Sequence, residues 1–547
     1  MINIYISVVF HANYLDTVYG TLMGVLNEYQ VPVSKVIGIC SDGASTMQGC
    51  HKGVCTQLAR HIRGTREDAM AELRRLHPEG RAPDTFHPDK GVFVVHCVCH
   101  RLALILTDAI KGSKACDVVI PDQCVALLNG LYSYFAKSPK RKAFIRTFLL
   151  HRNRNPEAFG VVRPNPQEEL DRVMAVLEEQ HKLPRKVVLT RWLSSAEAVR
   201  VVLTCRDTYA LFFDQIVNET HGEKATAISD WLQDNYIFGW YNCLQDVLPV
   251  LTGMNVLFQS SLPLPHLLYK KITAAKSTLV NMVGTGATRI ALLGIEEINV
   301  NTSFGAFSNK FIRENREGSV LRIHGSPLRD NDVMQLKREW HKFYAHCLRE
   351  IDTRFPPENM VMFRLLQVLD PYVVHGTTRR NEIGGADLSE VVRDLLFIFE
   401  LPWHQTRKGL PEEVINSFTA FRSSEESAEL WDSYVRRLPR NKPFDYTIIY
   451  AYYKELLANI EVSTWCWFCL FCLVMPTGNA ISERGFSAMG STHGKGRSEM
   501  GNQQVFANMM IAFNGPTVTD FAANAQRESD ELGDRWWGYV HPNNFNT

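Results

Sequence analysis

The 547-residue sequence has almost no excess charge of either sign. Lysine and arginine total 59 and aspartate and glutamate total 58, which leaves a net charge of +1. A chain with so little net charge has no overall field that draws it onto nucleic acid or a membrane surface. Any contact with a polyanion must therefore come from a local basic patch.

Long apolar runs are also missing. The longest is 465–475, eleven residues, whereas a membrane-spanning helix needs about 20. We predict that this run is a buried core segment and that a membrane is not a partner. The apolar start after Met1 lacks the positive charges that open a signal peptide.

The 13 cysteines are scattered and show no spacing typical of a secreted disulfide framework. Several stand in apolar surroundings, among them Cys466, Cys469 and Cys472. This pattern favours reduced thiols in an intracellular protein. The segment Gly284–Ala287 lacks the third glycine of a dinucleotide-binding loop and follows no strand, so that type of site is excluded.

The first 110 residues alternate between patterns typical of strands and of helices. β-Branched and apolar runs predict strands, and apolar positions three and four apart predict helices. The expected strands are 2–10, 36–40 and 91–95, and the expected helices are 12–29, 43–62 and 100–110. This order predicts an α/β layer with some parallel pairing.

Helical periodicity dominates from about residue 116 to 455, for example over 167–180 and 334–351. Further helices are expected near the end of the chain. We therefore predict three regions: an α/β core over 1–115, an all-α insertion over 116–455, and a closing segment over 456–547.

Two carboxylates are candidates for chemistry. Asp42 follows a predicted buried strand, and a carboxylate at a strand end is well placed to bind Mg²⁺. The alternative is that Asp42 caps the next helix, as aspartate often does. Glu483 opens a predicted helix, where a solvated first-turn glutamate is also favoured by the helix dipole.

Four segments together resemble the hAT family of cut-and-paste DNA transposases and their domesticated descendants. In chain order they resemble four motifs of that family: its second acidic motif, its Cys-x-x-His strand-to-helix junction, the Arg-Trp motif of its helical insertion and its C-terminal glutamate motif. The segments are Ile37–Met47, His96–Leu104, Thr190–Ser194 and Ala480–Ser487.

The resemblance implies an RNase H-like core interrupted by a large all-α insertion, with Asp42 and Glu483 as catalytic, metal-binding residues. The metal would be Mg²⁺ or Mn²⁺, and the reaction DNA strand cleavage and transfer. The family's first catalytic aspartate lies on an earlier strand, and Asp16 falls inside a predicted helix. No Cys/His set before Asp42 could form the BED-type zinc finger of many relatives. We therefore expect the core to lack its amino-terminal strands and the third carboxylate, and strand cleavage to be weak or absent.

Cys97 and His100 form the strand-to-helix junction of the resemblance. Cys-x-x-His is also half of a zinc site, to which Cys99, Cys50, Cys55 and His51 could add ligands. We favour packing and hydrogen bonding at the junction over zinc.

Nucleic-acid contacts are expected at two places. The resemblance places Arg191 and Trp192 near the DNA, where the indole could stack on a base; a core tryptophan with a paired arginine is the alternative. The densest basic stretch contains Lys140, Arg141 and Lys142, which could bind phosphates or form a solvated helix face. Its sequence also resembles a short nuclear-import signal, which predicts a nuclear protein.

The family uses its C-terminal region for dimerisation. Here that region carries an apolar helix face, which could also pack in the core: Val505, Phe506, Met509 and Met510. The leading hypothesis is a dimerising, DNA-binding hAT transposase-like protein with an incomplete catalytic site. The alternatives are an active transposase with a truncated gene model, and a host-recruited regulatory or scaffold protein that acts only through dimerisation.

Overall fold

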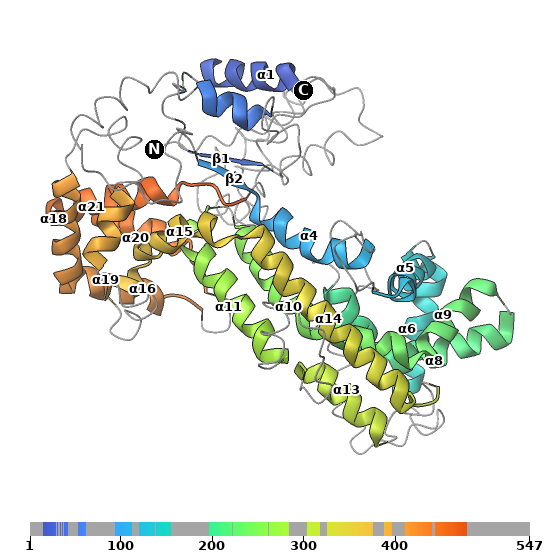
Figure 1. Ribbon diagram of the computed structural model, residues 1–547. Coiled ribbons are helices and arrows are strands. Elements are labelled where there is room, and N and C mark those ends of the chain that lie inside the picture. Colours follow the sequence, from blue (N-terminus) through green and yellow to red (C-terminus); the bar gives the residue numbers. More distant parts are fainter. Residues whose placement is uncertain are drawn as a thin grey trace, which may run out of the picture. The chain divides into compact units, whose positions relative to one another are not determined.

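The structure is a computed structural model of the chain (Figure 1). It describes residues 15–28, 30, 33, 36, 38–41, 53–61, 93–111, 120–136, 138–154, 196–220, 222–260, 262–283, 304–317, 325–375, 388–396, 411–439 and 444–478. The chain divides into a larger compact unit, Gln30–Gly478, and a smaller one that joins Ile2–Tyr29 with Asn479–Thr547. The element described in the smaller unit is α1 (Leu15–Glu28), as predicted.

A two-stranded parallel sheet is present in the described part of the larger unit. Strand β1 (Gly38–Ser41) pairs with β2 (Phe93–His96), and Ser41 lies opposite His96. Figure 1 shows the strands side by side, with a helix leading away from the end of β2. Both strands and their parallel pairing confirm the prediction. The expected strand 2–10 lies outside the described residues.

Helix α4 (Val98–Lys111) follows β2 directly and presents one apolar face. Val98, Leu102, Ile105 and Leu106 are almost completely buried. Their spacing places them on one side of a helix. That side packs against α10 and α14, so the sheet edge is anchored to the helical part of the same unit.

Every element described between residues 116 and 455 is a helix, which agrees with the predicted all-α segment. In chain order these are α5 (Asp122–Ala136), α6 (Pro139–Arg154), α8 (Ala196–Thr220), α9 (Glu223–Gln233), α10 (Asn235–Phe258), α11 (Pro265–Val283), α13 (Ala306–Arg316), α14 (Asp330–Arg354), α15 (Pro357–Leu365), the 3₁₀ turn η6 (Leu366–Leu369), α16 (Pro371–His375), α18 (Pro411–Ser423), α19 (Glu425–Arg436) and α20 (Ile448–Leu456). Two parallel strands do not distinguish an RNase H-like core from other α/β layers, so that finer expectation stays a prediction.

The long helices α10, α11 and α14 form the centre of the helical part and pack against one another (Figure 1). Helix α10 is apolar on most of its surface, and Trp240, Tyr241 and Leu244 are fully buried. A helix that is apolar all round is stable only when other elements surround it. The helix predicted over 334–351 lies within α14.

Asp246 is the buried acid of this central group and caps a neighbouring helix. Its carboxylate accepts hydrogen bonds from the N–H groups of Phe307 and Ser308, at 3.0 and 2.9 Å, and from the Ser308 hydroxyl at 2.7 Å. The first N–H groups of a helix have no partner within it. Asp246 therefore fixes the start of α13 against α10.

The apolar run 465–475 belongs to helix α21 (Ile460–Leu473) and the turn that follows. Trp465, Phe468, Cys469 and Cys472 are fully buried, and the helix packs against α18 and α20. The prediction of a buried core segment is confirmed. None of the helices in the described part of the chain is both long and apolar enough to cross a membrane.

Candidate functional site at the strand ends

The ends of β1 and β2 meet at one edge of the sheet, which is where the sequence predicts a carboxylate site. The Cys97 N–H donates a hydrogen bond of 2.7 Å to the carbonyl of Ser41. Both strands therefore end together before α4 begins. Asp42, the next residue after Ser41, lies outside the described residues.

The chain returns to this same edge after the helical region. The Val98 N–H donates to the carbonyl of Thr477 at 3.0 Å, and Thr477 is buried. A Cβ added at Gly478 would lie 3.2 Å from the carbonyl oxygen of Phe258 and 3.9 Å from the Cys97 sulfur. The close approach at this position therefore favours glycine. Glu483, five positions beyond Gly478, lies outside the described residues.

The end of α21 is held near the start of α11 by one side chain. The Tyr450 hydroxyl lies 2.6 Å from the carbonyl oxygen of Pro263 and 2.7 Å from that of Leu473. Because Leu473 closes α21, this contact fixes the point from which the chain runs to Thr477. The return to the sheet edge is thus anchored on α20 and on the loop between α10 and α11.

Four cysteines gather around the strand ends. The pKa of the Cys40 thiol is raised well above its usual value by a hydrogen bond with Cys97, by burial, and by the neighbouring thiols of Cys97, Cys99 and Cys55. The Cys55 thiol donates to the Ser41 hydroxyl at 3.8 Å, and the Cys99 thiol donates to the Asn255 carbonyl at 3.7 Å. A high pKa keeps a thiol protonated, and the thiolate is the form that binds metal.

Cys97 and His100 occupy different environments. The Cys97 side chain is fully buried, whereas His100 is exposed and its ring stacks on that of His96 with centroids 5.6 Å apart. Within the described ranges, no group of three or more His, Cys, Asp or Glu side chains is arranged to hold a metal ion. Cys97 is part of the packed interior at this junction. Cys50 and His51, the other zinc candidates, lie outside those ranges.

Arg101 connects the junction to the end of α14. Its Nη1 donates to the Arg354 carbonyl at 2.5 Å, and its guanidinium carbon lies 5.5 Å from the centre of the Phe355 ring. Burial lowers the pKa of Arg101; the thiols of Cys40 and Cys97 oppose this shift and the Arg354 guanidinium adds to it. No carboxylate partner of Arg101 is found among the described residues. Its guanidinium instead caps the last carbonyl of α14.

The predicted phosphate-binding lysines and arginine lie on α6. Lys140 and Arg141 are exposed and Lys142 is half-buried. The Arg141 guanidinium stacks 4.2 Å from the centre of the Tyr134 ring, and its Nη1 donates to the Tyr134 carbonyl at 3.2 Å. Arg141 is therefore held in one orientation against α5 while its charge stays at the surface.

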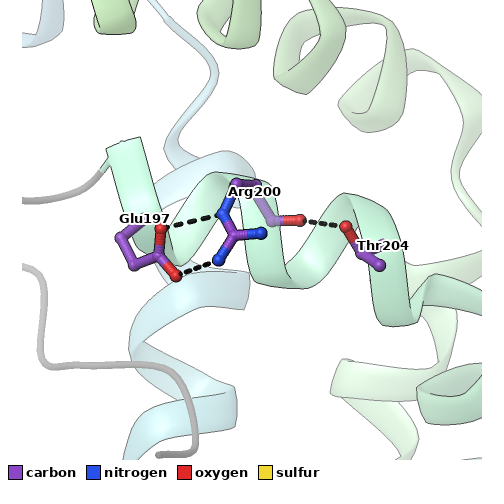
Figure 2. Close-up of polar contacts among 3 residues, drawn as sticks. All are labelled: Glu197, Arg200 and Thr204. Atoms are coloured by element: carbon purple, nitrogen blue, oxygen red, sulfur yellow. Dashed lines mark hydrogen bonds and ion pairs between the residues drawn. The ribbon is translucent and has the colours of Figure 1, made fainter. Parts of the chain in front are cut away.

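Arg191 and Trp192 lie outside the described residues; α8 follows them in the sequence. Figure 2 shows the first turns of α8, where both carboxylate oxygens of Glu197 accept from Arg200, at 2.8 Å from Nε and 2.6 Å from Nη2. The Thr204 hydroxyl donates to the Arg200 carbonyl at 2.9 Å. The Arg200 charge is thus paired within its own helix.

The expected dimerisation residues also lie outside the described residues: Val505, Phe506, Met509 and Met510. The structure adds two residues that the sequence did not single out, Thr477 and Arg101. The Pro-Thr-Gly break after the apolar run signals a turn, but no local pattern indicates that this turn lies beside α4.

A scan against models of known protein families finds no match for this chain, and a comparison with curated proteins finds none either. The resemblance to the hAT family therefore rests on the four segments of the sequence that carry it.

Proposed function

We propose that this chain is a hAT transposase-like protein that binds DNA and dimerises, and that Asp42 and Glu483 belong to one RNase H-like acidic site. We assign two carboxylates to this site, and the proposal includes weak or absent strand cleavage. The observation that carries this proposal is the meeting of Ser41 and Thr477 at the start of α4.

Each of these two residues adjoins a predicted catalytic carboxylate in the sequence. Ser41 precedes Asp42, and its carbonyl is bonded to Cys97; Thr477 shortly precedes Glu483, and its carbonyl is bonded to Val98. An interrupted core that is closed by the C-terminal segment accounts for this arrangement.

The proposed metal would be held by carboxylate oxygens. Asp42 and Glu483 would supply hard ligands suited to Mg²⁺ or Mn²⁺, and the bound ion would activate a nucleophile and stabilise the phosphate. The thiol of Cys40 is soft, and its raised pKa keeps it protonated, so it does not compete for such an ion. Two carboxylates hold Mg²⁺ less firmly than three.

Metal binding tests the shared site directly. We expect Asp42→Asn and Glu483→Gln each to weaken Mn²⁺ binding, measured by calorimetry, and the double variant to be little weaker than either one. This non-additivity is typical of residues that act together. Full additivity of the two losses would contradict a shared site.

Nuclease and dimer assays test the rest of the proposal. A supercoiled plasmid incubated with the 547-residue chain and Mg²⁺ or Mn²⁺ should show little or no nicking. Strong nicking that Asp42→Ala abolishes would disprove the impaired chemistry. A monomer mass at micromolar concentration would contradict dimerisation.

DNA binding and nuclear location are proposed on the basic residues of α6 and on the expected contacts of Arg191 and Trp192. The triple variant Lys140→Ala, Arg141→Ala and Lys142→Ala should weaken duplex binding. It should also flatten the salt dependence by about 0.9 in logarithmic slope for each phosphate that the variant no longer neutralises. An unchanged slope would exclude this helix from the DNA interface.

A further inference from the structure

Helix α6 is a concentrated positive element in a nearly neutral chain. Its 16 residues, Pro139–Arg154, include six lysines and arginines and no aspartate or glutamate. The whole chain carries only +1, so the remaining residues are negative on balance. A polyanion is therefore the charged partner that this helix fits.

One aromatic side chain is exposed among the charges of α6. Phe144 is 41% exposed, and it follows Lys140 and Arg141 by one helical turn, so the three side chains share a face. Ile145 and Phe148 are buried and attach the helix to the core.

The Phe144 ring packs against a buried aromatic ring of α8. Its centroid lies 5.6 Å from that of Phe212, which is buried, at an interplanar angle of 57°. Arg141 beside it is held in place by Tyr134. An exposed ring with a fixed position and flanking cations is the arrangement on which single-stranded nucleic acid stacks its bases.

Phe307 provides a contrast on the same chain. It is 44% exposed at the start of α13, but its N–H is bonded to the Asp246 carboxylate. Lys310, one helical turn beyond Phe307, is paired with Glu314, so among the described residues no cluster of unpaired cations flanks this ring. Exposure alone therefore does not make a stacking site, and the cations distinguish Phe144.

We propose that Phe144 stacks on an unpaired base of single-stranded nucleic acid while Lys140 and Arg141 bind the adjacent phosphates. The inference rests on the proposed DNA-binding function and adds to it a residue and a strand preference. A base can reach the ring only where it has left the duplex stack, so the contribution of Phe144 is specific to single strands.

The test compares two leucine substitutions in the full chain. Binding of a fluorescent single-stranded oligonucleotide of about 20 nucleotides and of its duplex is measured by anisotropy for the wild type, Phe144→Leu and Phe307→Leu. Leucine keeps an apolar side chain but cannot stack. Phe144→Leu should weaken single-strand binding by about tenfold and leave duplex binding within about twofold, and Phe307→Leu should change neither.

An abasic oligonucleotide of the same length isolates the stacking contribution. The wild type and Phe144→Leu should bind it equally, because it has phosphates but no bases. Equal binding of the base-containing single strand by the wild type and Phe144→Leu would overturn the inference while leaving DNA binding intact. A wild type that binds neither nucleic acid but does bind phosphatidylserine vesicles would overturn both the inference and the proposed function.

Discussion

The backbone N–H of Val98 and the carbonyl of Thr477 are joined by a hydrogen bond of 3.0 Å, although nearly the whole helical region separates them in sequence. Val98 is the first residue of α4, so its N–H has no acceptor within the helix. Thr477 supplies that acceptor. The start of a helix in the amino-terminal part of the chain is thus completed by a residue from far along the sequence.

Gly478→Ala tests how tightly this return is packed. The added methyl would lie 3.2 Å from the Phe258 carbonyl oxygen, so we expect a loss of about 1–3 kcal/mol in the free energy of unfolding. Gly253→Ala in α10 is the matched control, because nothing lies within 4 Å of the added methyl. It should stabilise by about 0.5–1 kcal/mol, and urea unfolding of both variants would show the opposite signs.

Asp246→Ala should destabilise the contact between α10 and α13. The change leaves two N–H groups and the Ser308 hydroxyl without their buried acceptor, at a cost of about 2–3 kcal/mol. Thermal unfolding measures the loss. If α13 instead finds water in place of the carboxylate, the melting temperature will hardly move and the capping role of Asp246 will be refuted.

His266 should make the protein sensitive to acid. Burial lowers its pKa to about 3, and neither ring nitrogen has a hydrogen-bond partner among the described residues. An unfolded chain binds this proton at about pH 6.5. Between these values the unfolded state holds the extra proton, so stability is complete above pH 6.5 and falls with pH by up to about 1.4 kcal/mol per unit.

His266→Phe removes this proton from the unfolded state and should flatten the decline between about pH 6.5 and 4.5 by about one proton. Part of the slope should remain, because burial lowers the pKa of His375 to about 4. Unfolding free energies at several pH values give the slopes directly. Parallel curves for the variant and the wild type would exclude His266 as the source.

Arg101→Ala should cost about 1–2 kcal/mol, because the Arg354 carbonyl at the end of α14 loses its donor and Phe355 loses the guanidinium beside it. The control is Lys276→Ala on α11. This variant removes an exposed ion pair with Asp352, which lies on α14 close to Arg354 in sequence. Exposed pairs contribute little, so this variant should change stability by at most about 0.5 kcal/mol. Equal effects of the two variants in urea unfolding would show that Arg101 contributes no more than a surface charge.

Local elements could be predicted from the sequence where one physical signal dominated. The apolar spacing of Leu102, Ile105 and Leu106 predicts α4, and the eleven-residue apolar run predicts the buried part of α21. Short strands such as β1 were recognisable because β-branched and apolar residues are bounded by turn residues.

The assembly of the site could not be predicted from these local signals. The contact between Val98 and Thr477 depends on the packing of the helices between them, and Arg101 acquires its role from the position of the α14 terminus. Neither has a periodic pattern. The roles of Asp42, Glu483, Arg191 and Trp192 stay predictions, because these residues lie outside the described part of the chain.

The bond between Val98 and Thr477 also sets an order of events during synthesis. Translation proceeds at about 5–20 residues per second, so the start of α4 waits roughly 20–80 seconds on the ribosome before its acceptor exists. During that time the Val98 N–H at the start of α4 lacks its native acceptor, and incompletely packed chains are prone to wrong contacts with other chains. A truncation that ends before Thr477 should therefore leave nascent chains that depend on chaperones, even where every helix upstream of it has formed.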